Sequence, residues 1–252
     1  MDTANRSALN AEQIKSYEDN GYLLTGKTLF SPNKFQTLYD IFEDLLATQG
    51  NSQGDELDVP HFSDERLFEF LLADEVLDIV QCLIGPNIGL WSSHFVCKEP
   101  QTGARTPWHD DRAYWEGRFD RFDGIVTLWL AIDESNRENG CMGVIPGTHL
   151  DDSKQHVPMD TEHKIFNIEI KDEDIDLEKV VWFELGQNYY SLHDSRIIHG
   201  ANANTSDARR TGFTMRYFNT DLKLAQAHPH NVNHKTYHCR GDNKGNNPLV
   251  HL

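Results

Sequence analysis

The strongest chemical signal in the sequence is the segment Thr106-Pro-Trp-His109-Asp110-Asp111. His109 and Asp111 are two residues apart, and side chains two residues apart on a β-strand point to the same face. If this segment is a strand, an imidazole and a carboxylate share one face and supply two of the ligands that a metal site needs. Asp110 would then point to the opposite face, beside the site or toward solvent. Because an H-x-D pair arises often by chance, a metal site needs a third ligand from elsewhere.

A third ligand is available far along the chain in Ile197-Ile-His199-Gly200. Two histidines and one carboxylate on one face of a metal form the facial triad of non-haem Fe(II) oxygenases. That arrangement leaves three coordination positions open, two for a bidentate co-substrate and one for O₂. We predict that His109, Asp111 and His199 converge. His193 is a rival for the distal position, and its alternative role is a structural one beside the site.

Two adjacent arginines, Arg209 and Arg210, follow the distal histidine. A planar guanidinium binds a carboxylate through two parallel hydrogen bonds, so Arg210 could hold an anionic co-substrate, with a surface pair as the alternative. The same three ligands also suit catalytic Zn²⁺ in a hydrolase. A non-catalytic jelly-roll binding protein or structural subunit is the remaining alternative. Activity that depends on Fe(II) and an anionic co-substrate, as against hydrolysis under anaerobic conditions, separates these possibilities.

The elements that must position these residues fall into two parts. Hydrophobic residues repeating every three to four positions, with capping and stop residues, predict helices over about 10–20, 31–50 and 74–84. After residue 86, short segments rich in β-branched and aromatic residues follow one another without intervening helices, which predicts an antiparallel barrel or sandwich. The predicted strands cover residues 88–98, 124–132, 141–145, 179–185, 189–192 and 212–219.

Composition narrows the function classes further. The chain has 252 residues, of which 40 are acidic and 23 basic, and this balance argues against binding to nucleic acid or to anionic membranes. It contains no run of about 18 apolar residues, no signal-peptide pattern and four cysteines without paired spacing, so we expect a cytoplasmic protein with reduced thiols. Motifs typical of dinucleotide dehydrogenases, P-loop enzymes, common serine hydrolases and zincins are absent.

Four ordered segments resemble the phytanoyl-CoA dioxygenase (PhyH) family of Fe(II)- and 2-oxoglutarate-dependent oxygenases. Their order and spacing together carry the resemblance, which runs over most of the chain. The segments are Leu9-Asn-Ala-Glu-Gln-Ile with Asn20-Gly-Tyr-Leu-Leu, Cys97-Lys98-Glu-Pro with Trp108-His-Asp-Asp111 and Tyr114-Trp115, Trp129-Leu-Ala-Ile with Glu138-Asn-Gly-Cys-Met and Ile145-Pro-Gly-Thr-His149, and His199-Gly200 with Asn204, Ser206 and Arg210.

The resemblance implies roles for particular residues. His109, Asp111 and His199 would bind Fe(II), and Arg210 would pair with the distal carboxylate of 2-oxoglutarate. Trp129 and His94 match positions that contact the co-substrate in relatives. One departure from the family pattern matters. Many relatives have Ser where this chain has Ala201, which puts one hydrogen bond to the co-substrate in doubt.

The resemblance also implies a fold and a reaction. We expect a mainly β protein with N-terminal helices, built on a double-stranded β-helix (jelly roll, cupin-like). Residues 1–252 would form one catalytic domain, with a helical buttress over 1–86, the jelly-roll core over 87–220 and a C-terminal lid or tail over 221–252. The expected reaction uses Fe(II), 2-oxoglutarate and O₂ to hydroxylate an unactivated C–H bond of a small metabolite, releasing succinate and CO₂. Because halogenating relatives lack the carboxylate ligand, Asp111 favours oxygenation. The substrate and the oligomeric state are not predicted.

Overall fold

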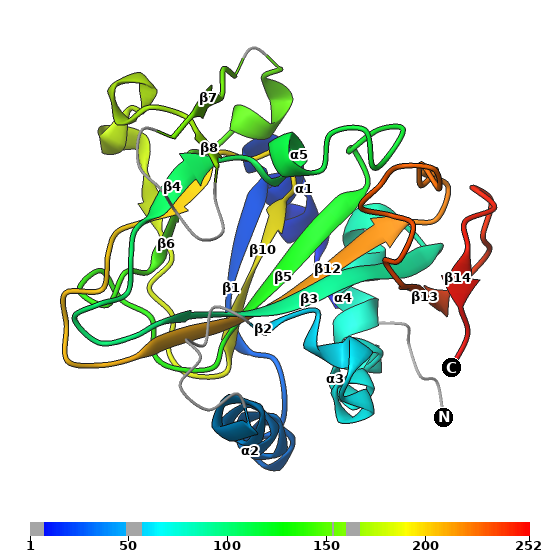
Figure 1. Ribbon diagram of the computed structural model, residues 1–252, viewed down its shortest axis with the longest axis horizontal. Helices are drawn as coiled ribbons and strands as arrows, with labels where there is room; N and C mark the ends of the chain where they lie inside the picture. The colour runs from blue at the N-terminus through cyan, green and yellow to red at the C-terminus, as the bar shows by residue number, and fades with distance from the viewer. Residues whose placement is uncertain (1–7, 49–56, 153, 160–166) are drawn as a thin grey trace.

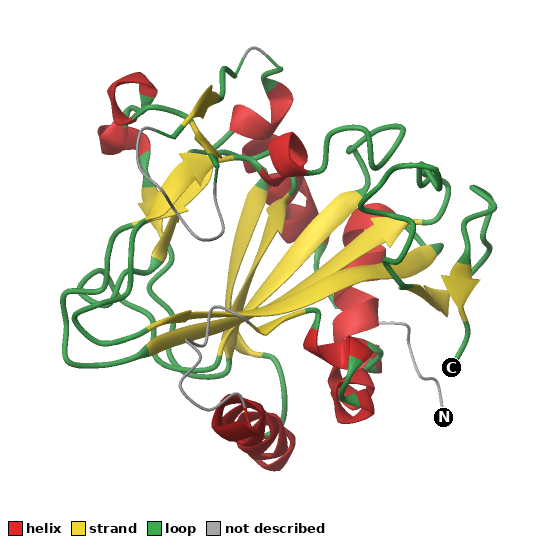
Figure 2. Cartoon of the chain, viewed as in Figure 1, coloured by secondary structure: helices red, strands yellow, loops and turns green. Residues whose placement is uncertain are grey.

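Two β-sheets face each other across a cavity, and helices cover the outer face of the larger sheet in the computed structural model (Figure 1). The structure describes residues 8–48, 57–152, 154–159 and 167–252. Figure 2 shows that strands form the centre of the molecule and that the longer helices lie at its periphery. This arrangement confirms the predicted mainly β, jelly-roll class, although the strands do not close into a barrel within the described ranges.

The larger sheet has eight strands in the described ranges and is antiparallel except where β13 meets β14. Its order is β1-β10-β5-β12-β3-β13-β14, and β2 pairs separately with β3. The strands are β1 (Tyr22–Thr28), β2 (Leu57–Asp58), β3 (Ile88–Lys98), β5 (Ile125–Ala131), β10 (Tyr189–Asp194), β12 (Arg210–Asn219), β13 (Thr236–Arg240) and β14 (Leu249–Val250).

The smaller sheet carries two of the three predicted metal ligands. Its four strands follow the order β4-β11-β6-β9, all antiparallel. They are β4 (Thr106–His109), β11 (His199–Ala201), β6 (Met142–Val144) and β9 (Val181–Trp182). A separate two-stranded ribbon joins β7 (Val157–Pro158) and β8 (Ile168–Glu169) above it (Figure 1).

The helices are α1 (Ala11–Asn20), α2 (Pro32–Thr48), α3 (Phe68–Leu71), α4 (Asp74–Ile84) and α5 (Asp111–Tyr114), with 3-10 turns at Pro60–Phe62, Glu65–Leu67, Thr148–Leu150, Asp172–Asp174 and Leu177–Lys179. The capping box predicted at the start of α1 is present: Asn10 and Gln13 exchange side-chain-to-backbone hydrogen bonds. Ala73, not Asp74, is the N-cap of α4, so Asp74 lies in the first turn and favours the helix through its charge. Within the described ranges, no helix is both long and apolar enough to cross a bilayer.

Side-chain alternation on the central strands separates the core from the cavity. On β12, Phe213 and Met215 face the hydrophobic core beneath the helices, while Thr214 and Arg216 face the cavity. The core continues into α2, where the Phe42 ring lies 4.9 Å from that of Phe95. One face of the larger sheet therefore packs in the hydrophobic core, and the other lines the cavity that holds the candidate site.

The larger sheet extends beyond the predicted core boundaries on both sides. β1 comes from the first third of the chain, where only helices were predicted from the periodicity, and it pairs with β10. The C-terminal segment supplies β13, which pairs with β3, so part of the predicted lid or tail is a sheet edge. Both strands are irregular in register with their neighbours.

Candidate metal and co-substrate site

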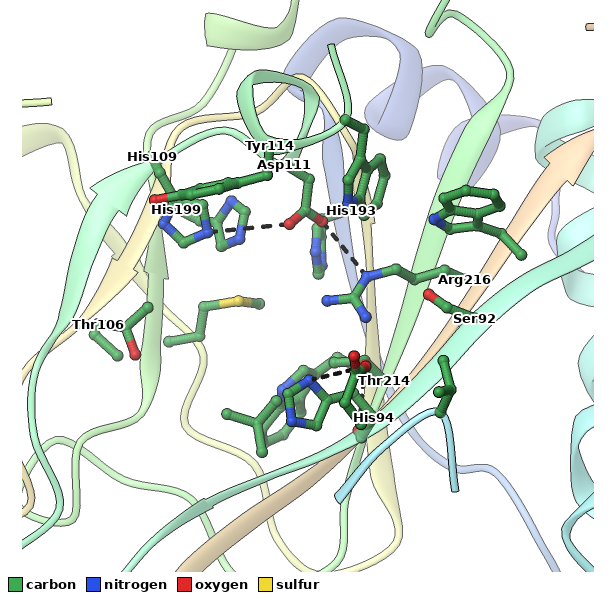
Figure 3. A pocket seen from close by; sticks show the side chains of 18 of the residues that line it. Ser92, His94, Thr106, His109, Asp111, Tyr114, His193, His199, Thr214 and Arg216 are labelled. Carbon is green, nitrogen blue, oxygen red and sulfur yellow. Dashed lines mark hydrogen bonds and ion pairs between the residues drawn. The ribbon is translucent and has the colours of Figure 1, made fainter. Parts of the chain in front are cut away.

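The structure brings His109, Asp111 and His199 together at the rim of the smaller sheet. One ligand atom from each lies within 4.8 Å of the other two. His109 and His199 are direct partners in the pairing of β4 with β11, and their ring centroids are 4.2 Å apart. Asp111 Oδ1 lies 4.0 Å from His109 Nε2. Figure 3 shows the three side chains pointing into the same space.

Asp111 reaches this position by a route that differs from the predicted one. Strand β4 ends at His109, and Asp111 is the first residue of the single-turn helix α5. Strand alternation is therefore the wrong reason for the shared face: a helix start turns the carboxylate back toward the histidines. Asp110 is the N-cap of α5 and accepts a hydrogen bond of 3.1 Å from the Ala113 amide.

Asp110 is fully buried, so its predicted solvent-facing position is wrong and only its place beside the site holds. Its carboxylate lies 3.6 Å from Lys154 Nζ, 3.6 Å from Arg112 Nε and 3.7 Å from His156 Nε2. The charges of Lys154 and Arg112 offset part of the cost of burying this carboxylate. The contacts hold the segment that precedes β7 against the start of α5.

Both histidines present the same ring nitrogen to the site. His109 Nδ1 lies 2.7 Å from the carbonyl oxygen of Pro107, and His199 Nδ1 lies 3.0 Å from that of Ile197. An Nδ1–H that donates to a carbonyl leaves Nε2 as a lone-pair donor for a metal. Burial, and after it the neighbouring His199, lowers the pKa of His109 well below its usual value, so this imidazole stays neutral.

This donor set fits a ferrous ion. Two neutral imidazole nitrogens and a carboxylate on one side of a shared space match the facial arrangement of non-haem iron sites. Asp111 Oδ2 is buried and has no hydrogen-bond partner among the described residues, which is costly unless a further group approaches it. Tyr114 supports His109 from the side, with the rings edge to face and 5.3 Å between centroids.

A cavity of about 650 Å³ extends from these ligands between the two sheets. Its size is within the usual range for sites that bind small molecules. All six residues predicted for the site line this cavity: His94, His109, Asp111, Trp129, His199 and Arg210. His193, the predicted rival ligand, lines it too, with its ring centroid 5.1 Å from that of His199.

Arg210 begins β12, is buried and lines the cavity. Its Nε and Nη2 donate to the carbonyl oxygen of Gly140, and its Cζ lies 5.5 Å from the centre of the Trp129 ring. Lys98 is its strand partner and donates from Nζ to the carbonyl oxygens of Ala104 and Asn202. Burial, with the charge of Arg210, lowers the pKa of Lys98 to about 6. Among the described residues Arg210 forms no ion pair, so its positive charge suits a carboxylate ligand.

The other residues considered for the co-substrate lie in different surroundings. Arg209 points to the outside, where it binds Asp133 and Glu43 and lies over the Phe42 ring. Ala201 is the strand partner of Thr106, and both residues line the cavity. A hydroxyl group is thus available across the strand from the position at which many relatives have Ser.

His94 lies on β3, across the cavity from the two histidine ligands (Figure 3). Its Nδ1 is 3.7 Å from Asp58 Oδ1 at the cavity rim. Arg216 was missed in the sequence. Its Nε lies 3.7 Å from Asp111 Oδ2, and it lines the cavity six residues after Arg210 on the same strand. Even spacing from Arg210 on a predicted strand was the available signal.

Two histidines and one carboxylate gathered on a jelly-roll fold form the arrangement that is typical of non-haem Fe(II) oxygenases. The model of the phytanoyl-CoA dioxygenase (PhyH) family matches residues 17–212, and the chain belongs to this family.

Individual relatives agree with the family match. The chain is similar to a probable phytanoyl-CoA dioxygenase from Caenorhabditis elegans, at 31% identity over 250 residues that cover 87% of this chain and 78% of that protein. It is 33% identical to the peroxisomal phytanoyl-CoA dioxygenase of Mus musculus over 177 residues, or 61% of this chain. That match spans about half of the mouse protein, 52% of its length.

Solved structures agree on the fold. The non-heme alpha ketoglutarate dependent carbocyclase SnoK from nogalamycin biosynthesis superposes with a TM-score of 0.68. Its sequence is 22% identical, and the match covers 88% of this chain and 91% of that one.

Proposed function

We propose that this chain is an Fe(II)- and 2-oxoglutarate-dependent dioxygenase that hydroxylates an unactivated C–H bond of a small metabolite, with release of succinate and CO₂. One observation carries the proposal: three ligand atoms from β4, α5 and β11 lie within 4.8 Å of one another in a cavity that the buried Arg210 also lines. Membership in the PhyH family supports it. Neither a zinc hydrolase nor a non-catalytic binding protein has an observation in its favour.

The protein's own residues would do the following work. His109, Asp111 and His199 would hold the metal and leave the cavity side of it open. Arg210 would bind the distal carboxylate of 2-oxoglutarate, while Trp129 would pack beside it. Bound Fe(II), with 2-oxoglutarate and O₂, supplies the oxidising chemistry that activates the C–H bond. The walls of the cavity would exclude bulk water and orient the substrate.

Three further assignments belong to this proposal. Residues 1–252 would act as one catalytic domain, and the presence of β1, β12 and β13 in one sheet supports that. The partner would be a small molecule, with no nucleic acid or membrane involved. A cytoplasmic location is supported by Cys97, Cys141 and Cys239, which are free thiols in the structure.

The experiment compares His199→Ala with a matched variant at the rival histidine, His193→Gln. Both residues are buried and line the same cavity. We expect His199→Ala to lose at least 100-fold in Fe(II) affinity and to make no succinate from 2-oxoglutarate, because ligand loss removes a metal bond that water replaces poorly. His193→Gln should bind Fe(II) within about threefold of wild type. Iron affinity is measured anaerobically by calorimetry, and succinate by NMR. Retained iron binding and succinate formation in His199→Ala would refute the assignment of the distal ligand.

A further inference from the structure

We propose that Arg216 is the recognition group for an oxyanion on the primary substrate, a carboxylate or a phosphonate, and that the substrate is therefore an organic acid. This inference rests on the proposed function and adds the substrate class to it. It comes from a largely buried guanidinium that lines the cavity beside the metal ligands and donates no hydrogen bond to any residue that the structure describes.

The donors of Arg216 are free. Its closest ionic contact is the 3.7 Å separation between Nε and Asp111 Oδ2, which is too long for a hydrogen bond. Nε is buried without a hydrogen-bond partner, and the guanidinium donates no hydrogen bond to any residue that the structure describes. A largely buried guanidinium whose Nε has no hydrogen-bond partner among the described residues is costly, and a ligand that accepts its hydrogen bonds removes that cost.

The other two arginines of the cavity are already engaged. Arg118 donates to Asn231 Oδ1 at 2.8 Å and to the His230 carbonyl at 3.0 Å, and its Cζ lies 4.3 Å from the centre of the Trp91 ring. Arg210 donates to the Gly140 carbonyl and is assigned to 2-oxoglutarate in the proposed function. Arg216 is therefore the arginine of this cavity whose guanidinium is available to an anion other than 2-oxoglutarate.

The charge balance near the metal ligands leads to the same conclusion. The only carboxylates among the described residues that line the cavity are Asp111 and Asp58, and the Asp58 side chain is 69% exposed at the rim. With a metal bound, the charge of the metal would offset that of Asp111, and the metal and Arg210 together would offset that of 2-oxoglutarate. The positive charge of Arg216 would then have no buried negative charge to balance it. An anionic group on the substrate supplies it.

Two indole rings beside Arg216 orient its guanidinium and offer an apolar surface for the carbon skeleton of a substrate. Its Cζ lies 5.5 Å from the centre of the Trp115 ring, and the Trp115 and Trp91 rings meet edge to face with centroids 6.2 Å apart. Figure 3 shows the guanidinium entering the space between Asp111 and His94. An acid whose carbon skeleton lies along these indoles can place its oxygens on Nη1 and Nη2 by bidentate pairing.

The test measures binding, with no turnover, by calorimetry on protein loaded with Mn(II) and 2-oxoglutarate under argon. The probes share one chain and differ in the head group: hexanoate, hexylphosphonate, hexan-1-ol and hexylamine. We expect one or both acids to bind at least tenfold more tightly than the alcohol and the amine, and the two acids together distinguish carboxylate from phosphonate recognition. Omitting the metal should weaken acid binding, because Asp111 then competes for Arg216.

The variants are Arg216→Gln, Arg216→Lys and a matched loss of charge at the surface, Arg121→Gln. Arg121 is half-exposed and pairs with Asp123 outside the cavity. Arg216→Gln should weaken acid binding by about 10- to 100-fold, the usual worth of a hydrogen-bonded charge, and Arg216→Lys should restore part of it. Arg121→Gln should bind the acids as wild type does. Circular dichroism and the melting temperature confirm that each variant is folded.

Four results would overturn the proposal: no acid binding to wild type, equal binding of acid and alcohol, unchanged acid binding in Arg216→Gln, or a loss in that variant confined to Mn(II) or 2-oxoglutarate affinity. The last result would make Arg216 a support for the metal ligand Asp111. Failure of wild type to bind 2-oxoglutarate would instead refute the proposed function. Acid binding to the protein with Mn(II) alone would still test Arg216 in that case.

Discussion

At the scale of residues, the site depends on which nitrogen of each histidine faces the cavity. Both imidazoles bind the carbonyl oxygen two residues before them, at Pro107 and Ile197, through Nδ1. Local backbone geometry thus selects the tautomer before any metal arrives, and no distant side chain is needed. This lowers the cost of assembling the site, because neither ring has to turn or lose a proton at the metal.

Variants of the neighbouring arginines Arg209 and Arg210 distinguish an effect on 2-oxoglutarate binding from an effect on the stability of the fold. We expect Arg210→Ala to raise the 2-oxoglutarate concentration for half-maximal succinate formation by about 10- to 100-fold, because a buried charge-assisted pair is lost. Iron affinity should change little. Both quantities are measured on the same preparations, the first by succinate titration and the second by anaerobic calorimetry.

Arg209→Ala is the matched control for this pair. It removes the contacts with Asp133 and Glu43 on the outer face and should lower the melting temperature while leaving the 2-oxoglutarate requirement within twofold of wild type. If the requirement rises in Arg209→Ala and stays constant in Arg210→Ala, the co-substrate arginine has been misassigned.

At the scale of elements, strand β12 joins the core to the chemistry. Its odd-numbered residues Phe213, Met215 and Tyr217 lie in the hydrophobic core, and Arg210 and Arg216 lie at the cavity. Between them, Gly212 leaves room for the Trp129 indole of the neighbouring strand. A methyl group at residue 212 would lie 1.9 Å from Trp129 Cζ2, which no side chain can tolerate.

Gly212→Ala should therefore move Trp129 and disturb Arg210. We expect a loss of about 1–3 kcal/mol in the free energy of unfolding, measured in urea, because overpacking forces side chains off their preferred rotamers. The 2-oxoglutarate requirement should rise at the same time. Gly186→Ala is the control, since the nearest atom to its new methyl group is 3.3 Å away in the Tyr189 ring, and it should cost less than 1 kcal/mol. Equal stability losses in the two variants would contradict the close packing at Gly212.

At the scale of the whole molecule, segments from both ends of the chain complete the larger sheet. His61 marks one such junction: its Nδ1 lies 2.6 Å from Ser93 Oγ on β3, and its ring lies 5.5 Å from that of Tyr237 on β13. Its Nε2 is buried without a partner among the described residues. Burial, and after it the nearby His234, lowers the pKa of His61 to about 3.

This buried histidine makes the stability of the fold depend on pH. Below the unfolded-state pKa of about 6.5, the unfolded chain takes up a proton that the folded protein does not, so the free energy of unfolding falls as the pH falls toward 3. Between pH 7 and pH 5, His61 should account for about 2 kcal/mol of that loss. His61→Gln cannot titrate there, and its loss over this interval should be smaller by about that amount. Urea unfolding of both proteins at the two pH values measures the difference, and equal losses would show that His61 titrates normally in the fold.

Much of the molecule follows from local patterns. The capping box of α1, the three-to-four-residue periodicity of α2 and α4, and the β-branched runs of β3, β5 and β12 all depend on neighbouring residues, so they are readable without the fold. The ligand types were also readable, because His109, Asp111 and His199 are chemically distinctive.

Tertiary structure alone decided how these parts meet. Strands β1 and β13 are stabilised by partners far along the chain, and the hydrophobic pattern of their own residues predicted neither of them. The helix start that turns Asp111 toward the histidines depends on Asp110, whose buried carboxylate needs Lys154 and His156 nearby. Only the folded structure shows that no described residue accepts a hydrogen bond from Arg216. Hydrophobic periodicity is a local property, whereas strand pairing and the balance of buried charge depend on contacts between distant residues.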